Sequence, residues 1–291
     1  MTQIIEHLSE ISDQYDALFV DLWGCVHNGL TPFPAAVAAL QQYRAKGGKV
    51  VLVTNSPRPH ASVEIQLEQI GVPRDAWDTM ATSGDSARAA MHLGAVGDKI
   101  YFIGDGEVDM GFFDHMSIID NSRDIQQVPL AEAEGIVCTG PFDPNADPSV
   151  YRAEFLMAKQ MGLKLLCANP DIVVDRGEKR EWCAGALAQL YTEMGGESLY
   201  FGKPHPPIYD LARRRLAALE VDVADDKILA IGDGIITDVA GGVGENIDVL
   251  FISGGLAAAE TATKYQPDEA LLKSWLETQD HHPTYTIGFL R

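Results

Sequence analysis

Positively charged residues are few in this 291-residue chain. It contains 22 Lys and Arg residues against 42 Asp and Glu residues, which gives a formal net charge of −20 and an isoelectric point near 4.6. A surface this acidic repels nucleic-acid backbones and anionic lipid, so we expect neither nucleic acid nor a membrane as a partner. A site for an anionic substrate must then depend on a metal ion and a few placed cations that reverse the field locally.

Cysteines and long apolar runs are also scarce. No C-x-x-C pair is present, so neither a zinc site of that spacing nor a disulfide framework is predicted. The four cysteines are widely separated: Cys25, Cys138, Cys167 and Cys183. No apolar run of 18 or more residues occurs, which argues against a membrane span. The first 16 residues are acidic and amphipathic, unlike a signal peptide, so we expect a cytoplasmic protein.

Short apolar runs alternate with helical patterns along the chain, which is typical of a parallel sheet covered by helices. Strands are predicted at 16–21, 49–55, 227–233 and 247–253, and helices at 1–12, 33–48, 59–71, 148–162 and 180–196. We predict an α/β fold with a doubly wound, Rossmann-like parallel-sheet core. Residues 1–84 and 197–291 would form this core, and residues 85–196 would form an inserted α/β domain.

Polar side chains follow four of the apolar strands. They are Asp21, then Thr54 and Asn55, then Lys203, and finally Asp233 and Asp238. Any one of them alone would be interpreted as a helix cap, a turn former or a surface residue. Ligands of open parallel sheets, however, bind beyond the carboxyl ends of the strands. The combination therefore predicts a site rather than four separate turns.

This set of groups suits phosphoryl transfer. A carboxylate can attack phosphorus and form an aspartyl-phosphate, which makes Asp21 the candidate nucleophile. Two anions repel each other, so a Mg²⁺ held by Asp21 and Asp233, with Asp238 as a direct or indirect partner, is expected between them. Lys203 and the Thr54 hydroxyl would stabilise the transferring oxygens.

The segments that carry these residues resemble the four motifs of the haloacid dehalogenase (HAD) superfamily, and specifically its class IIA branch of C2-capped sugar-phosphate, nucleotide and p-nitrophenyl-phosphate phosphatases. The matches extend over residues 16–255. They comprise D-x-x-G with a second Gly eight residues after the Asp (Asp21, Gly24, Gly29), VTNS (53–56), ATSG (81–84), CANPD (167–171), AGAL (184–187), FGKP (201–204) and GDGIITD (232–238).

The resemblance implies roles for several residues. The inserted segment would be a C2-type cap that closes the active site and selects the substrate. Asn55 would join Thr54 and Lys203 in binding phosphate, and the main-chain carbonyl of Trp23 would join the three acids as a metal ligand. It further implies Mg²⁺ as cofactor, a small phosphorylated metabolite as substrate and, by analogy with the branch, a homodimer.

One position departs from the family pattern. The phosphatases carry a second Asp two residues after the nucleophile, and Trp23 stands there. An indole cannot perform the acid–base step, which is worth about 10²–10⁴-fold, so substrates whose leaving group needs no proton are favoured. Trp23 would either fill space against the cap or stack on a planar substrate group. His27 and His205 are substitute acid–base candidates, although each also fits a plain loop histidine. We also place His27, with Trp23, among the substrate-binding residues.

We therefore predict a Mg²⁺-dependent phosphatase for a small phosphorylated metabolite, with two alternatives open. One is a HAD hydrolase of another reaction class, such as phosphonate or carbon–halogen hydrolysis; dehalogenation is disfavoured because the metal-site acids are intact. The other is a metabolite-binding protein without turnover. Cys25 lies close to Asp21 in sequence, but no evident base would activate it, so we interpret it as a small buried residue.

Overall fold

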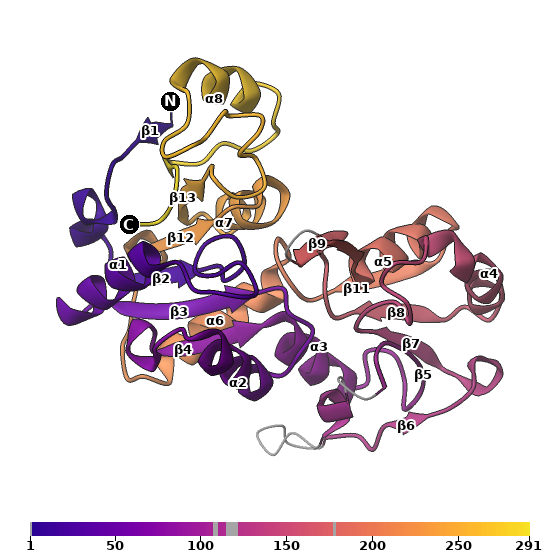
Figure 1. The fold of residues 1–291 in the computed structure, drawn as a ribbon. Coiled ribbons are helices and arrows are strands. Elements are labelled where there is room, and N and C mark those ends of the chain that lie inside the picture. Colours follow the sequence, from indigo (N-terminus) through magenta and orange to yellow (C-terminus); the bar gives the residue numbers. More distant parts are fainter. Residues whose placement is uncertain (1, 107–109, 115–121, 177–178) are drawn as a thin grey trace. The chain divides into compact units, whose positions relative to one another are not determined.

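The chain folds into two compact units, which a computed structural model describes for residues 2–106, 110–114, 122–176 and 179–291. The first unit comprises Met1–Thr54, Glu64–Ala81 and Tyr209–Arg291, and the second comprises Asn55–Val63 and Thr82–Ile208. Each contains a sheet with parallel strands and flanking helices (Figure 1). The predicted α/β fold class is confirmed.

The first unit is built on a seven-stranded sheet with the order β1-β14-β13-β12-β2-β3-β4. Its strands are β1 (Gln3–Ile4), β2 (Ala17–Val20), β3 (Lys49–Thr54), β4 (Thr79–Thr82), β12 (Ile228–Gly232), β13 (Asp248–Ile252) and β14 (Tyr285–Ile287). Strand β2 pairs in parallel with β3 on one side and β12 on the other, and Figure 1 shows these segments from the two ends of the chain side by side. All four residues of β2 are buried, as expected for a central strand covered on both faces.

The first unit contains all or part of α1 (Pro34–Ala45), α2 (His60–Ile70), α6 (Pro206–Ala217), α7 (Ala240–Gly244) and α8 (Glu269–Leu276). Helix α1 packs on β3, and α7 packs on β13. Pro34 stands at the first position of α1, where its missing N–H leaves no intrahelical bond unmade. Among the described residues, none of these helices combines the length and the apolar character that crossing a bilayer requires.

The predicted helix at 1–12 is wrong. Residues Gln3–Ile4 form the edge strand β1, which pairs in parallel with β14. The N–H of the next residue, Ile5, donates to the Thr286 carbonyl of β14 at 2.9 Å. Short 3₁₀ turns follow, including Leu8–Glu10. Ile5, Leu8 and Ile11 are all buried, and their spacing of three residues suits a 3₁₀ period as well as a helix face. Backbone pairing with a strand far along the chain decides between the two.

The second unit contains a five-stranded sheet with the order β11-β8-β7-β5-β6, and its strand pairs are parallel. Its strands are β5 (Lys99–Ile103), β6 (Gln126–Gln127), β7 (Gly135–Cys138), β8 (Lys164–Cys167) and β11 (Glu197–Tyr200), and its helices are α3 (Ser83–His92), α4 (Arg152–Gln160) and α5 (Ala184–Glu193).

Both faces of this smaller sheet are covered. Ile136 of β7 belongs to a core that contains Phe155 of α4 and Tyr191 of α5. Val137, the next residue, belongs to a core that contains Met91 of α3. Successive strand residues point to opposite faces, so a strand buried on both sides reads as a continuous apolar run in the sequence.

The segment around residue 180 differs from the prediction. The expected helix at 180–196 begins only at Ala184, because Lys179–Trp182 form strand β10, antiparallel to β9 (Val173–Arg176). Strand β11 lies just beyond the predicted end of the inserted domain at residue 196, and it pairs with β8 in the second unit. The division into a core of 1–84 and 197–291 with a cap at 85–196 stays a prediction.

Candidate functional site

Asp21 and Asp233 end two neighbouring strands of the first unit. Asp21 directly follows β2, and its N–H donates to the carbonyl of Ile231 in β12 at 2.8 Å. Asp233 directly follows β12. Because β2 and β12 run parallel, both carboxylates emerge at the same edge of the sheet. Both residues are buried, with 8% and 7% of their surface exposed.

These two acids form a group with a thiol. Ligand atoms of Asp21, Cys25 and Asp233 all lie within 4.8 Å of one another, and all three residues are buried. A pair of buried carboxylates at this separation fits a divalent cation, which would offset their repulsion. Asp238, predicted as a further metal acid, is not part of this group.

The carboxylate of Asp233 is held between two glycines. An added Cβ would lie 2.2 Å from Oδ2 of Asp233 if placed on Gly24, and 2.0 Å from it if placed on Gly255. Gly24 also has a φ of +77°, which residues with a side chain rarely adopt. The Leu256 N–H donates to the same oxygen at 3.1 Å. Main-chain atoms therefore fix where this carboxylate lies.

Asp238 supports the loop that carries Asp233. It lies in a π-helix, Ile235–Val239, a rare conformation that often marks functional sites. Its Oδ2 accepts a hydrogen bond from the Gly234 N–H at 3.1 Å, and the residue is buried. The carboxylate thus ties the end of the loop back to the residue that follows Asp233.

Trp23 packs within its own turn. An added Cβ on Gly29 would lie 2.3 Å from Cη2 of the indole, and Gly29 has a φ of +86°. The Trp23 and His27 rings meet edge to face, with their centroids 5.4 Å apart and an interplanar angle of 73°. The second glycine of the sequence motif therefore leaves room for the indole. Its stacking on a substrate stays a prediction.

His27 is held as a neutral ring. Its Nδ1 accepts a hydrogen bond from the Gly29 N–H at 2.9 Å, so the proton of the neutral imidazole lies on Nε2. Burial lowers the pKa of His27 to about 4. A neutral ring in this tautomer can donate a hydrogen bond through Nε2, but it is a poor proton donor and has no unengaged basic nitrogen. The geometry does not favour His27 as a substitute acid or base.

Thr54 is the last residue of β3, and it is buried. Since β3 pairs in parallel with β2, with Leu52 opposite Val20, Thr54 lies at the same sheet edge as Asp21. Three of the strand-end residues that the sequence singles out, Asp21, Thr54 and Asp233, therefore lie at one edge of the sheet in the first unit.

Lys203 and Asn55 belong to the second unit, where Asn55 connects two loops. Its side-chain oxygen accepts from the Lys203 N–H at 2.7 Å, and its side-chain nitrogen donates to the Lys203 carbonyl at 3.2 Å and to Oδ1 of Asp171 at 2.8 Å. Lys203 is buried. We did not predict this network, although the segment 167–171 that contains Asp171 was a visible signal. The role of both residues in phosphate binding stays a prediction.

His205, the other acid–base candidate, also lies in the second unit. Its ring stacks on Tyr200, with centroids 4.9 Å apart and an interplanar angle of 11°. Burial lowers the pKa of His205, which favours the neutral ring. This stacked position explains the histidine without an acid–base role.

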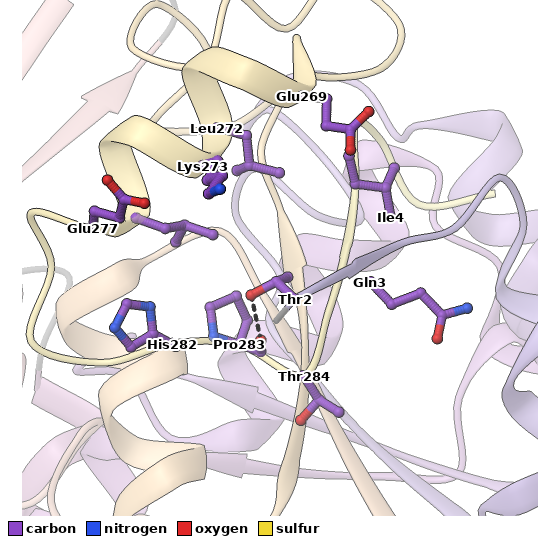
Figure 2. Close-up of a pocket in the computed structure, with 11 residues that line it drawn as sticks. Thr2, Gln3, Ile4, Glu269, Leu272, Lys273, Glu277, His282, Pro283 and Thr284 are labelled. Carbon is purple, nitrogen blue, oxygen red and sulfur yellow. Dashed lines mark hydrogen bonds between the residues drawn. The ribbon is translucent and has the colours of Figure 1, made fainter.

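A cavity of about 990 Å³ lies elsewhere in the first unit. Figure 2 shows it between α8 and the segments Thr2–Ile4 and 282–284, with the Thr2 hydroxyl donating to the Pro283 carbonyl at 2.8 Å. Residue 284 precedes β14, so the cavity lies toward the amino end of that strand. Its lining contains none of the predicted site residues.

Comparison with known proteins decides the family. A model described as haloacid dehalogenase-like hydrolase matches residues 18–114, and one described as HAD-hydrolase-like matches residues 200–278. The crystal structure of a hydrolase of the haloacid dehalogenase-like family from Brucella suis 1330 is 41% identical, covers 99% of this chain and 100% of its own, and has a TM-score of 0.85. The chain belongs to the haloacid dehalogenase-like hydrolase family. The resemblance predicted from its motifs is confirmed.

More distant proteins are similar to this HAD-like hydrolase over most of its length. A glycerol phosphate phosphatase from Mycobacterium tuberculosis, solved in complex with calcium, is 22% identical, covers 95% of this chain and 74% of its own, and has a TM-score of 0.63. The chloroplastic phosphoglycolate phosphatase 1A of Arabidopsis thaliana is 23% identical over 288 residues, which is 92% of this chain and 77% of the relative. The first of these shares the fold.

Gly255→Ala should weaken divalent-cation binding by this HAD-like hydrolase. The new methyl group would push the Asp233 carboxylate away, and loss of a supporting group typically costs about 10–100-fold in metal affinity. Titration calorimetry with Mg²⁺ or Mn²⁺ measures the change. Gly244→Ala is the matched control, because its Cβ would meet nothing within 4 Å. Equal affinities in the two variants would contradict the role of Gly255 in placing the Asp233 carboxylate.

His27 should make the HAD-like hydrolase acid-sensitive. Its pKa is about 4 when folded against an ordinary 6.5, so the unfolded chain binds the proton first as pH falls. The free energy of unfolding should therefore decrease between pH 6.5 and pH 4, by up to about 3 kcal/mol at about 1.4 kcal/mol per pKa unit. Urea unfolding at pH 7.5 and pH 4.5 should show a smaller decrease for His27→Asn than for wild type. The exposed His281→Asn control should behave as wild type.

Proposed function

We propose that this chain is a Mg²⁺-dependent phosphatase that acts on a small phosphorylated metabolite, a sugar phosphate or nucleotide-like ester, through an aspartyl-phosphate on Asp21. The observation that carries the proposal is the buried pair Asp21 and Asp233 at one sheet edge of a HAD-like hydrolase. The names of similar proteins support a small phosphate ester, since they include a phosphoglycolate phosphatase and a glycerol phosphate phosphatase.

The residues present fit a hard divalent cation. Mg²⁺ takes oxygen ligands, keeps several waters and needs only one or two carboxylates, which Asp21 and Asp233 provide. By the family resemblance, the main-chain carbonyl of Trp23 is a further ligand. Asp238 acts indirectly in this proposal, because its Oδ2 is bonded within its own loop. The bound cation supplies positive charge that reduces the repulsion between carboxylate and phosphoryl group.

The reaction would proceed in two displacements. The Asp21 carboxylate attacks phosphorus, the bond from phosphorus to the ester oxygen breaks, and water later hydrolyses the aspartyl-phosphate. By the resemblance, the Thr54 hydroxyl and the Lys203 ammonium hold the phosphoryl oxygens as charge develops on them. The buried position of Asp21 keeps its carboxylate away from bulk solvent.

Departure of the leaving group is the weak step. Trp23 cannot donate a proton, and His27 is neutral with Nδ1 already bonded to Gly29. The departing oxygen must therefore leave as an anion or take a proton from water. We propose a preference for acidic leaving groups, such as those of acyl and aryl phosphates, over the alkoxides of sugar phosphates.

Trp23 also favours a second candidate, a metabolite-binding protein of the same family with little or no turnover. Its indole occupies the place of the missing acid and is packed against Gly29 and His27. Tight binding of a phosphorylated metabolite without hydrolysis would support this candidate. The cytoplasmic location and the homodimer expected from the sequence remain predictions.

Asp21→Asn tests the nucleophile. A panel of p-nitrophenyl phosphate, acyl phosphates and sugar phosphates is assayed with Mg²⁺ on wild type and variant. Wild type should exceed the variant by at least about 10³-fold, because removing a covalent nucleophile leaves only binding and electrostatic assistance. Equal rates on every ester would contradict the proposed mechanism, whereas binding of an ester with no wild-type turnover would favour the second candidate.

Trp23→Asp tests the leaving-group argument, with Trp23→Asn as the matched control. Both variants lose the indole packing on Gly29, so their stability losses should be similar. Only the Asp can donate a proton, and kcat on a sugar phosphate should be about 10²-fold or more higher in Trp23→Asp. The gain should be smaller on p-nitrophenyl phosphate, whose leaving group needs no proton. Equal kcat values for the two variants would show that the missing acid is not the limitation.

A further inference from the structure

Cys25 places sulfur beside the two carboxylates of the candidate site. Its Sγ lies within 4.8 Å of carboxylate oxygens of both Asp21 and Asp233, and the residue is only 1% exposed. Neither the phosphatase mechanism nor the family resemblance uses this thiol.

The turn that carries Cys25 is fixed by main-chain hydrogen bonds. The Gly24 N–H donates to the His27 carbonyl at 2.9 Å, and the Val26 N–H donates to the Leu22 carbonyl at 2.8 Å. Cys25 stands between these two bonded residues, so its main chain is fixed, and its Sγ lies beside the two carboxylates. Asp233 is fixed in turn by the main chain of Gly24 and Leu256. A preorganised ligand set binds a cation with little loss of conformational freedom.

The other cysteines have a different setting. Cys138 and Cys167 belong to a hydrophobic core of the second unit, and Cys183 precedes helix α5. In the described part of the chain, none of them is found in a group of three ligating side chains. The thiol at position 25 therefore differs from the remaining three in what surrounds it.

Two oxygens and one sulfur are a ligand set that suits a softer ion than Mg²⁺. Mg²⁺ selects oxygen ligands, whereas Zn²⁺ accepts thiolate and carboxylate together. Zinc sites with three protein ligands keep a fourth position for water or another ligand. Soft thiolate ligands are among those that select Zn²⁺.

We propose that Asp21, Cys25 and Asp233 together bind Zn²⁺ or a similar thiophilic divalent cation. Cys25 binds as the thiolate, its proton passes to solvent, and no atom is oxidised or reduced. The bound ion excludes Mg²⁺ and engages the Asp21 carboxylate, so it inhibits phosphoryl transfer. This inhibition rests on the proposed phosphatase function, but the cation site itself does not.

The test uses Co²⁺ as a spectroscopic probe of the metal-free full chain and Zn²⁺ as its competitor. Wild type should develop a near-ultraviolet charge-transfer band from thiolate to cobalt, which Zn²⁺ removes. Cys25→Ser should lose the band. Its Zn²⁺ affinity should fall at least about tenfold, since loss of even an outer partner of a metal ligand typically costs that much. The control Cys183→Ser changes a different buried cysteine, which precedes helix α5. This variant should keep both the band and the Zn²⁺ affinity.

The outcomes separate this site from the phosphatase proposal. A folded wild type without the band, or a band that persists in Cys25→Ser, overturns the inference whatever the enzyme hydrolyses. A band in wild type that is lost in Cys25→Ser upholds the site even if no phosphate ester is turned over. Circular dichroism of each variant identifies one that fails to fold; if Cys25→Ser does so, Cys25→Ala replaces it in the same measurement.

Discussion

The parallel pairing of β2 with β12 is the constraint on which the candidate site depends. It brings the first long apolar strand of the chain against one from its final third, and it places Asp21 and Asp233 at one edge. Bringing two carboxylates together in a buried setting is costly, and burial of the surrounding strands offsets that cost. A cation bound between them, as we propose, would offset their repulsion. The sheet thus determines the chemistry before any substrate is considered.

Much of this arrangement is predictable because the determining signals are local. An apolar run that ends in a polar residue marks a strand end, and strand order then brings Asp21, Thr54 and Asp233 to one edge. The sequence alone did not predict β1, where the same apolar spacing fits a helix and a 3₁₀ turn. It also did not predict β10, which pairs with β9, so that the helix expected from residue 180 begins only at Ala184. Pairing with another strand decided both cases, with the distant β14 for β1 and with the adjacent β9 for β10. The apolar spacing within one segment does not show such pairing.

The site shows the same limit at the level of side chains. Residue types predicted that Asp21 and Asp233 would meet, but they did not predict that Cys25 would join them or that His27 would be fixed as a neutral tautomer. Those facts depend on the turn after β2, in which a glycine N–H rather than a side chain engages the imidazole. The sequence named Trp23 as the departure from the family pattern, and the packing against Gly29 gives it a structural reason.

The strand order also has a consequence for synthesis of the protein. The edge strand β1 pairs with β14, which is made much later in synthesis because it lies far along the chain. The buried strand β2 likewise lacks one neighbour until β12 has been made. The apolar residues 17–20 therefore cannot complete their strand pairing until the residues of β12 have been made. Contacts between segments so distant in sequence also form slowly. Until β12 and β14 have been made, these unpaired strands expose apolar surface that is prone to aggregation.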